Sequence, residues 1–138
     1  MNILWLDTET FSECDLIAHG THRYATDPST EIIVAQWALD DEVPTVADMT
    51  LPQYEHGHPE LGRLLRDPNV IVVAHNSFFD RNVIREVWGI DIPIERWRDT
   101  MVQSYAHGLP GALGKVGEAL GLPADEQKDK RGKQLIAL

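Results

Sequence analysis

The sequence lacks the features that would tie a chain to a membrane or to an oxidising compartment. Its single cysteine, Cys14, has no partner for an internal disulfide or a zinc site, which fits a reducing environment. No apolar run approaches the length of a membrane span, and the N-terminus lacks the charged and then apolar layout of a signal peptide. We therefore expect a cytosolic protein with no membrane contact.

Positive charge is also scarce. The chain carries 12 lysines and arginines against 22 acidic residues, for a formal net charge of −10. This balance disfavours broad electrostatic adhesion to nucleic acid, although bound metal ions can offset the charge locally. A few basic residues gather toward the carboxyl end and could touch phosphates, but neighbouring acids favour a solvated surface for them: Lys115, Lys128, Lys130, Arg131 and Lys133.

The size and composition are those of one globular domain. The chain has 138 residues, of which 43% are hydrophobic and 25% charged. No internal repeat or linker divides it, so we predict a single domain over residues 1–138. The last residues, 135–138, are apolar and stop without a turn signal. We therefore expect this domain to be shortened at its carboxyl end.

The stretch that organises the chain is an apolar run, residues 3–6, that leads into Asp7-Thr8-Glu9-Thr10. On an extended strand, Asp7 and Glu9 point to the same side, with Cα atoms roughly 6–7 Å apart. Two such anions repel unless a cation lies between them. Mg²⁺ or Mn²⁺ prefers carboxylate ligands, so the pair indicates a metal site at a strand end. Taken alone, such a pair more often belongs to a solvated turn, and its position at the end of an apolar strand is what favours a metal site here.

Hydrophobic patterning predicts an α/β fold. The first strand and residues 31–39 and 43–47 can form an antiparallel meander of three strands, after a long loop over residues 10–30. The uniformly apolar run 70–74 is typical of a parallel strand covered by helices. Helices with an apolar period of 3.6 residues are expected elsewhere: 59–66, a helix beginning near Asn76 or Ser77 and ending at Gly89, 101–107 and 112–120.

A second polar cluster follows the apolar run 70–74. Asn76 and Asp80 are four residues apart, so on a helix they would share one face at the carboxyl end of that strand. If this strand lies beside the first, Asp80 can approach Asp7 and Glu9. Taken alone, Asp80 could instead be an acid in the first turn of a helix, stabilised by the helix dipole.

These motifs resemble those of DEDD-type 3′–5′ exonucleases. Residues 7–10 resemble the first motif of that family, and residues 76–80 resemble the second. The wider sequence, including residues 97–101 and 106–111, is most similar to the proofreading exonuclease domain of phage family A DNA polymerases. The resemblance covers nearly the whole chain in the right order, which makes it more specific than either motif alone.

The resemblance implies a ribonuclease H-like sheet with helices on both faces and a site that holds two divalent ions, Mg²⁺ or Mn²⁺. By this resemblance, Asp7 bridges the two ions, Glu9 holds the ion that carries the attacking water, and Asp80 serves the other ion. These three acids are the expected catalytic and metal-binding residues.

The resemblance also implies the substrate, the 3′ end of single-stranded DNA. Thr8, Thr10 and Phe11 would lie near the terminal nucleotide, and Asn76 would help to orient the site. Phe11 or Phe79 would offer an aromatic face to a base, which tolerates any base. Phe79 could instead be a core residue.

One part of the family pattern is missing. The family has a fourth acid within Tyr-x-x-x-Asp or His-x-x-x-x-Asp, but Tyr105 and His107 are followed at these spacings by Leu109 and Ala112. Asp99 corresponds to a family position outside the metal quartet. Loss of such a group typically costs 10²–10⁴-fold in rate, so we expect a weak or inactive enzyme. An incomplete core would also favour self-association.

Other functions stay open at this point. The chain could be a non-catalytic module that binds nucleic acid or a DNA polymerase on an exonuclease fold. It could also be an RNA exonuclease of the same superfamily, because nothing in the sequence reads a 2′-hydroxyl. A haloacid dehalogenase-like phosphatase is disfavoured, since its second strand-end acid would be Asp and this chain has Glu9.

Overall fold

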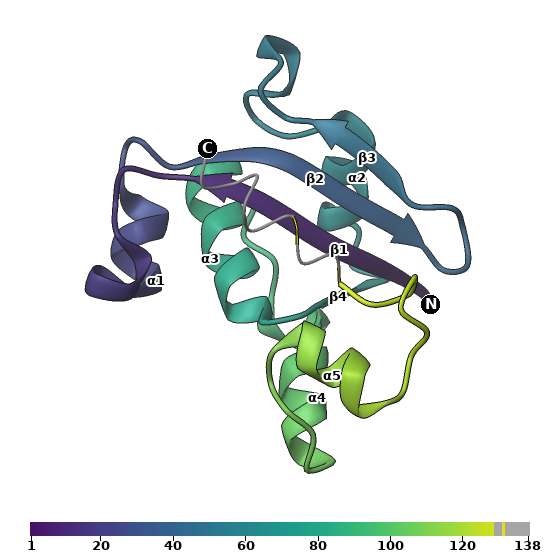
Figure 1. Cartoon of the computed structure of the whole chain (residues 1–138). Coiled ribbons are helices and arrows are strands. Elements are labelled where there is room, and N and C mark those ends of the chain that lie inside the picture. The colour runs from purple at the N-terminus through teal and green to yellow at the C-terminus, as the bar shows by residue number, and fades with distance from the viewer. Residues whose placement is uncertain (129–130, 132–138) are drawn as a thin grey trace. The chain divides into compact units, whose positions relative to one another are not determined.

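The computed structural model describes residues 1–128 and 131 (Figure 1). The chain divides into two compact units, Met1–Asp99 and Thr100–Leu138, and each is described by itself. The elements of the first unit are β1 (Asn2–Phe11), α1 (Leu16–Thr26), β2 (Glu31–Leu39), β3 (Thr45–Asp48), α2 (Pro59–Arg66), β4 (Val70–Ala74), α3 (Ser77–Trp88) and β5 (Trp97–Asp99), with short 3₁₀ turns at Pro52–Tyr54 and Ile94–Arg96.

The five strands form one mixed sheet in the order β3-β2-β1-β4-β5. β1 runs antiparallel to β2, and β2 runs antiparallel to β3, as the predicted meander requires. β4 lies parallel to β1 on its other side, and β5 lies parallel to β4. The predicted α/β class with a mixed sheet is thereby confirmed.

Burial alternates along β1 and separates its two faces. Leu4, Leu6 and Thr8 are buried, whereas Ile3 and Trp5 are 39% and 46% exposed. Leu4 and Leu6 belong to one apolar core with side chains from α2 and α3. Figure 1 shows both helices on the same side of the sheet. The helices of this unit therefore cover the Leu4 face, and the Trp5 face of β1 stays accessible.

β4 accompanies β1 over only part of its length. Asn2–Trp5 pair with Val70–Val73, whereas β2 pairs with β1 from Leu4 to Phe11. Beyond Trp5, β1 has β2 on one side, while on the other side the chain leaves β4 and enters α3. This is the sheet edge at which the carboxyl ends of parallel strands meet, where α/β proteins place their sites.

The predicted end of the first strand is wrong. Asp7 and Glu9 lie inside β1, because β2 continues to pair with β1 as far as Phe11. The register shifts between Glu9 and Thr10, which marks a bulge or irregularity directly after the second carboxylate. The two acids are therefore fixed by the β1–β2 hydrogen-bond ladder and do not lie in a turn.

The predicted long loop over residues 10–30 is also wrong, because it contains α1. Asp15 caps this helix, and its carboxylate accepts hydrogen bonds from the amides of Ile17 and Ala18. Gly20, with a φ of 80°, interrupts the helix, and only Tyr24 and Ala25 are buried. An amphipathic period is too weak in such a helix to be recognised from the sequence.

The second unit contains α4 (Thr100–Ala106) and α5 (Leu113–Ala119). These helices match the two predicted ones and are separated by the turn that begins at Gly108, whose φ is 70°. A Cβ atom at Gly111 would collide with the ring and hydroxyl of Tyr105, so a larger residue here would displace the Tyr105 side chain. Across residues 1–128 and 131, no helix has the length and apolar character needed to cross a membrane.

One buried arginine joins α2 to β4. The Arg96 side chain donates hydrogen bonds to the carbonyls of Val70 at 2.8 Å, Leu65 at 2.7 Å and Leu64 at 3.3 Å. Leu64 and Leu65 lie in the last turn of α2, where carbonyls have no partner within the helix. Arg96 is only 9% exposed, so its charge is compensated by these backbone dipoles. It thereby fixes the start of β4.

Replacing Arg96 by leucine should destabilise the fold strongly, because it leaves buried carbonyls without donors. We expect the R96L variant to lose about 3 kcal/mol in free energy of unfolding, measured by urea titration. The matched control is R98L, because Arg98 is exposed and bonds to the carbonyls of Glu95 and Trp97. Equal losses in the two variants would contradict the role given to Arg96.

Candidate functional site

The two sequence motifs meet through a hydrogen bond between buried side chains. The Thr8 hydroxyl on β1 donates to Oδ1 of Asp80 on α3 at 2.7 Å. Thr8 is 8% exposed and Asp80 is 4% exposed. The contact is possible because β4 ends before Thr8, which lets the first turn of α3 approach β1. Thr8, which the resemblance predicts near the substrate, holds Asp80 in the structure through this bond.

The pKa of the Asp80 carboxyl is higher than that of an ordinary aspartate. Burial raises the pKa of Asp80 to about 7, the hydrogen bond from Thr8 works in the opposite direction, and the negative charges of Asp7 and Asp99 raise it further. A carboxyl that titrates near neutral pH, beside other acids at the carboxyl edge of a sheet, is typical of functional sites.

Asp7 and Glu9 lie on the other side of β1 from Thr8. Both are exposed, and they share the face that carries Ile3 and Trp5. Asp7 is paired with Gln36 and Glu9 with Val34 on β2. The expectation that these two acids point to one side of the strand therefore agrees with the burial pattern.

The carboxylates suit a divalent cation in their chemistry. Asp7, Glu9 and Asp80 offer the oxygen ligands that Mg²⁺ and Mn²⁺ prefer. The influence of Asp7 on the pKa of Asp80 indicates that two of these groups lie within electrostatic reach. In the described part of the chain, however, no three His, Cys, Asp or Glu side chains are arranged so that they could hold a metal ion. The shared cation site stays a prediction.

The start of α3 is fixed by a carboxylate from a different strand. Asp99, at the end of β5, accepts hydrogen bonds from the amides of Asn76 at 3.0 Å and Ser77 at 2.8 Å, and from the Ser77 hydroxyl at 3.0 Å. The side chain of Asn76 does not cap α3. Asp99 thus satisfies amides at the N-terminus of α3, next to the turn that carries Asp80.

The position of Asn76 differs from the expected helical one. Asn76 is the residue before α3 and has a left-handed backbone with a φ of 66°, so it is exposed while Asp80 is buried. Asparagine tolerates this conformation better than most residues. The spacing predicted a shared helical face, but the turn capped by Asp99 separates the two side chains.

The expected substrate contacts fall into two groups. Phe11, at the end of β1, is 54% exposed and open to a ligand. Thr10 instead shares a hydrogen bond of 2.8 Å with the hydroxyl of Tyr24 on α1. Phe79 is partly buried against the core, with its ring 5.6 Å from that of Tyr24. Thr10 and Phe79 therefore help to attach α1 to the sheet and to α3.

Two residues at the site were missed by sequence reasoning. Tyr24 falls in the segment predicted as a loop, and nothing in the sequence around it indicates that it contacts Thr10 and Phe79. Asp99 was set apart from the metal quartet, but its place as an acid at a strand end could have suggested a helix cap.

Among the basic residues, Lys115 contacts Glu118 at 3.5 Å and Lys128 is exposed. Lys130 and Lys133 lie outside the described residues.

Removing the Asp99 carboxylate should destabilise the start of α3. We expect D99A to lose about 1–2 kcal/mol in free energy of unfolding, because three hydrogen bonds to the cap disappear. D99N, which keeps an acceptor but not the charge, should lose less. The control is D91A, an exposed acid that precedes β5. Urea titration of all three variants would contradict this role if D99A and D91A were equally stable.

The raised pKa of Asp80 predicts a dependence of stability on pH. In the unfolded chain this carboxyl ionises near 3.8, whereas in the fold it stays protonated up to about pH 7. Ionisation therefore favours the unfolded state, and the penalty grows from pH 4 to pH 7 and is constant above that. At 1.36 kcal/mol per pKa unit, it reaches roughly 4 kcal/mol.

The D80N variant removes this penalty, so it should be more stable than the original chain at pH 8 and should lose this advantage near pH 4. The measurement is urea titration in EDTA at both pH values, with the exposed acid replaced in D41N as control. A difference between D80N and the original chain that does not change with pH would show that Asp80 titrates normally.

The sequence matches a family model described as 3′–5′ exonuclease over residues 7–119. It is 37% identical over 140 residues to a DNA polymerase of Bacillus phage SP02, an alignment that covers 99% of this chain. The chain spans 20% of the length of that polymerase. These matches confirm the resemblance predicted from residues 7–10 and 76–80.

Solved structures share the fold at low sequence identity. Brucella melitensis NrnC with bound Mg²⁺ has a TM-score of 0.65 and 18% identity, over 93% of this chain and 56% of that chain. Escherichia coli RNase D, an exoribonuclease involved in structured RNA processing, has a TM-score of 0.61 and 19% identity, over 96% of this chain and 30% of that chain. With the sheet, the joined motifs and the family match together, the chain belongs to the 3′–5′ exonuclease family.

Proposed function

We propose that this chain hydrolyses terminal phosphodiester bonds at the 3′ end of single-stranded DNA, with Mg²⁺ or Mn²⁺ held by Asp7, Glu9 and Asp80. The observation that carries the proposal is the buried contact of Thr8 with Asp80, which joins segments 72 residues apart. The pKa of Asp80, about 7, supports the proposal because Asp7 contributes to it.

The three acids would approach a bound cation from different sides of β1. Thr8 holds Oδ1 of Asp80, so the carboxylate is oriented by one oxygen and would offer Oδ2 to a cation. Asp7 and Glu9 would approach from the exposed face of β1, where solvent and substrate can reach them. The chemistry that two such cations supply when bound is activation of water and stabilisation of charge on the phosphate.

The exposed Phe11 and Asn76 would contact the terminal nucleotide. Stacking of a base on Phe11 is independent of base identity, which suits removal of any mispaired nucleotide. Thr10 and Phe79 would act indirectly, through Tyr24 and the attachment of α1. Both assignments rest on where these side chains lie in the structure and on the family resemblance.

The DNA substrate and a polymerase partner are suggested by the relative in Bacillus phage SP02, which is itself a DNA polymerase. Action beside a polymerase would give this chain a proofreading role. RNA is the alternative substrate, since one structural neighbour is described as an exoribonuclease.

A non-catalytic nucleic-acid-binding module is the second candidate. Such a module would use the exposed Phe11 to stack a base and would need no bound cation. In this case DNA would bind but would not be cut. The two candidates therefore differ in turnover and not in binding.

The decisive assay is Mn²⁺-dependent shortening of a 5′-labelled single-stranded oligonucleotide. D7N and D80N should each lower the rate at least 100-fold, because each removes a carboxylate from the proposed cation site. They should also weaken Mn²⁺ binding measured by calorimetry.

The matched control is D41N, an exposed acid in the turn after β2, which should cut normally. Unchanged turnover by D80N would refute the assigned site. Binding of DNA without any turnover by the original chain would favour the second candidate.

A further inference from the structure

The positively charged side chains of the first unit are all arginines, and several of them lie near the candidate site. Residues 1–99 contain seven arginines and no lysine. Three of them, Arg23, Arg81 and Arg85, lie on α1 and α3, the helices that flank the start of the candidate site. Arginine is the side chain best suited to bind phosphate through two donors at once.

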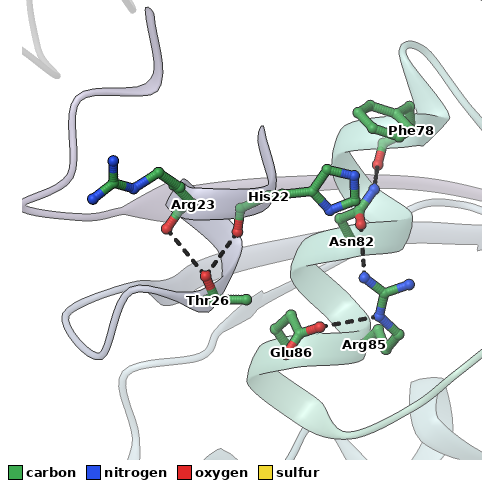
Figure 2. A network of polar contacts seen from close by, with 7 residues as sticks. All are labelled: His22, Arg23, Thr26, Phe78, Asn82, Arg85 and Glu86. Carbon is green, nitrogen blue, oxygen red and sulfur yellow. Dashed lines mark hydrogen bonds and ion pairs between the residues drawn. The ribbon is translucent and has the colours of Figure 1, made fainter. Parts of the chain in front are cut away.

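An exposed aromatic side chain lies beside these arginines. Phe78 is two residues before Asp80 and is 45% exposed. The ring of His22 on α1 meets it edge to face, with centroids 5.5 Å apart and an interplanar angle of 86°. Figure 2 shows His22 reaching from α1 toward Phe78 on α3. The contact holds the Phe78 ring in place while nearly half of it stays open to solvent.

Phe78, Arg81 and Arg85 follow one side of α3 at spacings of three and four residues, which places neighbouring side chains about 5–6 Å apart. We call these three residues the α3 strip. The Arg85 guanidinium contacts Glu86 at 3.1 Å and donates to Oδ1 of Asn82 at 2.8 Å. Asn82 in turn donates to the Phe78 carbonyl at 2.7 Å, so this part of the helix is held firmly (Figure 2).

Arg81 differs from Arg85 in its partners. Among residues 1–128 and 131, Arg81 makes neither a side-chain hydrogen bond nor an ion pair, and it is partly exposed. In a chain of net charge −10, an uncompensated arginine next to an exposed aromatic ring is a local exception. An aromatic face beside a free guanidinium matches a base followed by a phosphate.

We propose that the α3 strip binds the single strand of DNA that leads away from the 3′ end, with a base stacked on Phe78 and a phosphate bound by Arg81. The inference rests on the proposed function, because it adds a subsite beyond the terminal nucleotide. The strand is DNA because the relative that shares 37% identity with this chain is a DNA polymerase. Phe78 and Arg81 bind and position the strand and take no part in bond cleavage.

The test is binding of a fluorescent oligodeoxynucleotide in EDTA, measured by polarisation, so that it is independent of cleavage. F78L should weaken binding about ten-fold, because it keeps an apolar side chain but loses the stacking face, whereas F78Y should bind normally. R81Q should lower the slope of log Kd against log salt concentration by about 0.7, the value for one phosphate contact on a single strand.

The matched control for charge is R23Q. Arg23 lies on α1, and Figure 2 shows its guanidinium directed away from Phe78, so R23Q should leave affinity and salt slope unchanged. A dinucleotide too short to reach the strip should bind all variants alike. Circular dichroism of each variant separates loss of binding from loss of fold.

Three outcomes would overturn the inference: no binding of the oligodeoxynucleotide by the original chain, equal binding by F78L and F78Y, or equal effects of R81Q and R23Q. An effect seen only with an RNA oligonucleotide would also overturn it, since the strip would then serve a different strand. The proposed function fails separately, through the absence of Mn²⁺-dependent shortening, because this binding assay contains no metal.

Discussion

The buried hydrogen bond between Thr8 and Asp80 is the contact on which the site depends. It links the strand with two exposed acids to the helix that follows the parallel strand β4. The pairing of β4 with β1 ends at Trp5, and the chain then enters α3, whose first turn reaches Thr8 on the buried face of the sheet. The cost of burying an ionisable carboxyl is visible in its raised pKa, near 7. A buried carboxyl whose pKa is raised in this way, beside other acids, is typical of functional sites.

Three devices hold this contact in place, and each comes from a different part of the sheet. Arg96 ties the end of α2 to the start of β4. Asp99, at the end of β5, caps the turn that leads into α3. Tyr24 on α1 contacts both Thr10 and Phe79. Together these contacts fix the strand before α3, the turn that begins α3, and the packing of α3 against α1.

The sequence predicts those parts of the fold that repeat along the chain. Continuous or alternating hydrophobicity identified β2 and β4 and most of the helices, because burial of apolar side chains is what forms them. α1 escaped because Gly20 interrupts it and because few of its residues are buried. The cap of α3 was not predicted because its carboxylate belongs to Asp99, which lies 23 residues after Asn76 and 22 residues after Ser77. Contacts of that kind leave no periodic signal.

The candidate site divides in the same way. Asp7, Glu9 and Asp80 are predicted as site residues from their motifs. The burial pattern and register of β1 then show that Thr8 lies on the inner face and that Asp7 and Glu9 lie on the outer face. Thr10 and Phe79 are predicted as substrate contacts, and the structure adds that both contact Tyr24 on α1.

Because β4 pairs with only the first residues of β1, the two halves of β1 differ in how well their amide protons are protected from exchange with solvent. The first residues of β1 have hydrogen-bonded neighbours on both sides, but from Leu6 to Phe11 the ladder continues on the β2 side alone. Local opening costs less where fewer ladder bonds must break. Amide protons in the second half of β1 should therefore exchange with solvent sooner than those in the first half. The two acids thus lie on the part of the central strand that only the β2 ladder holds.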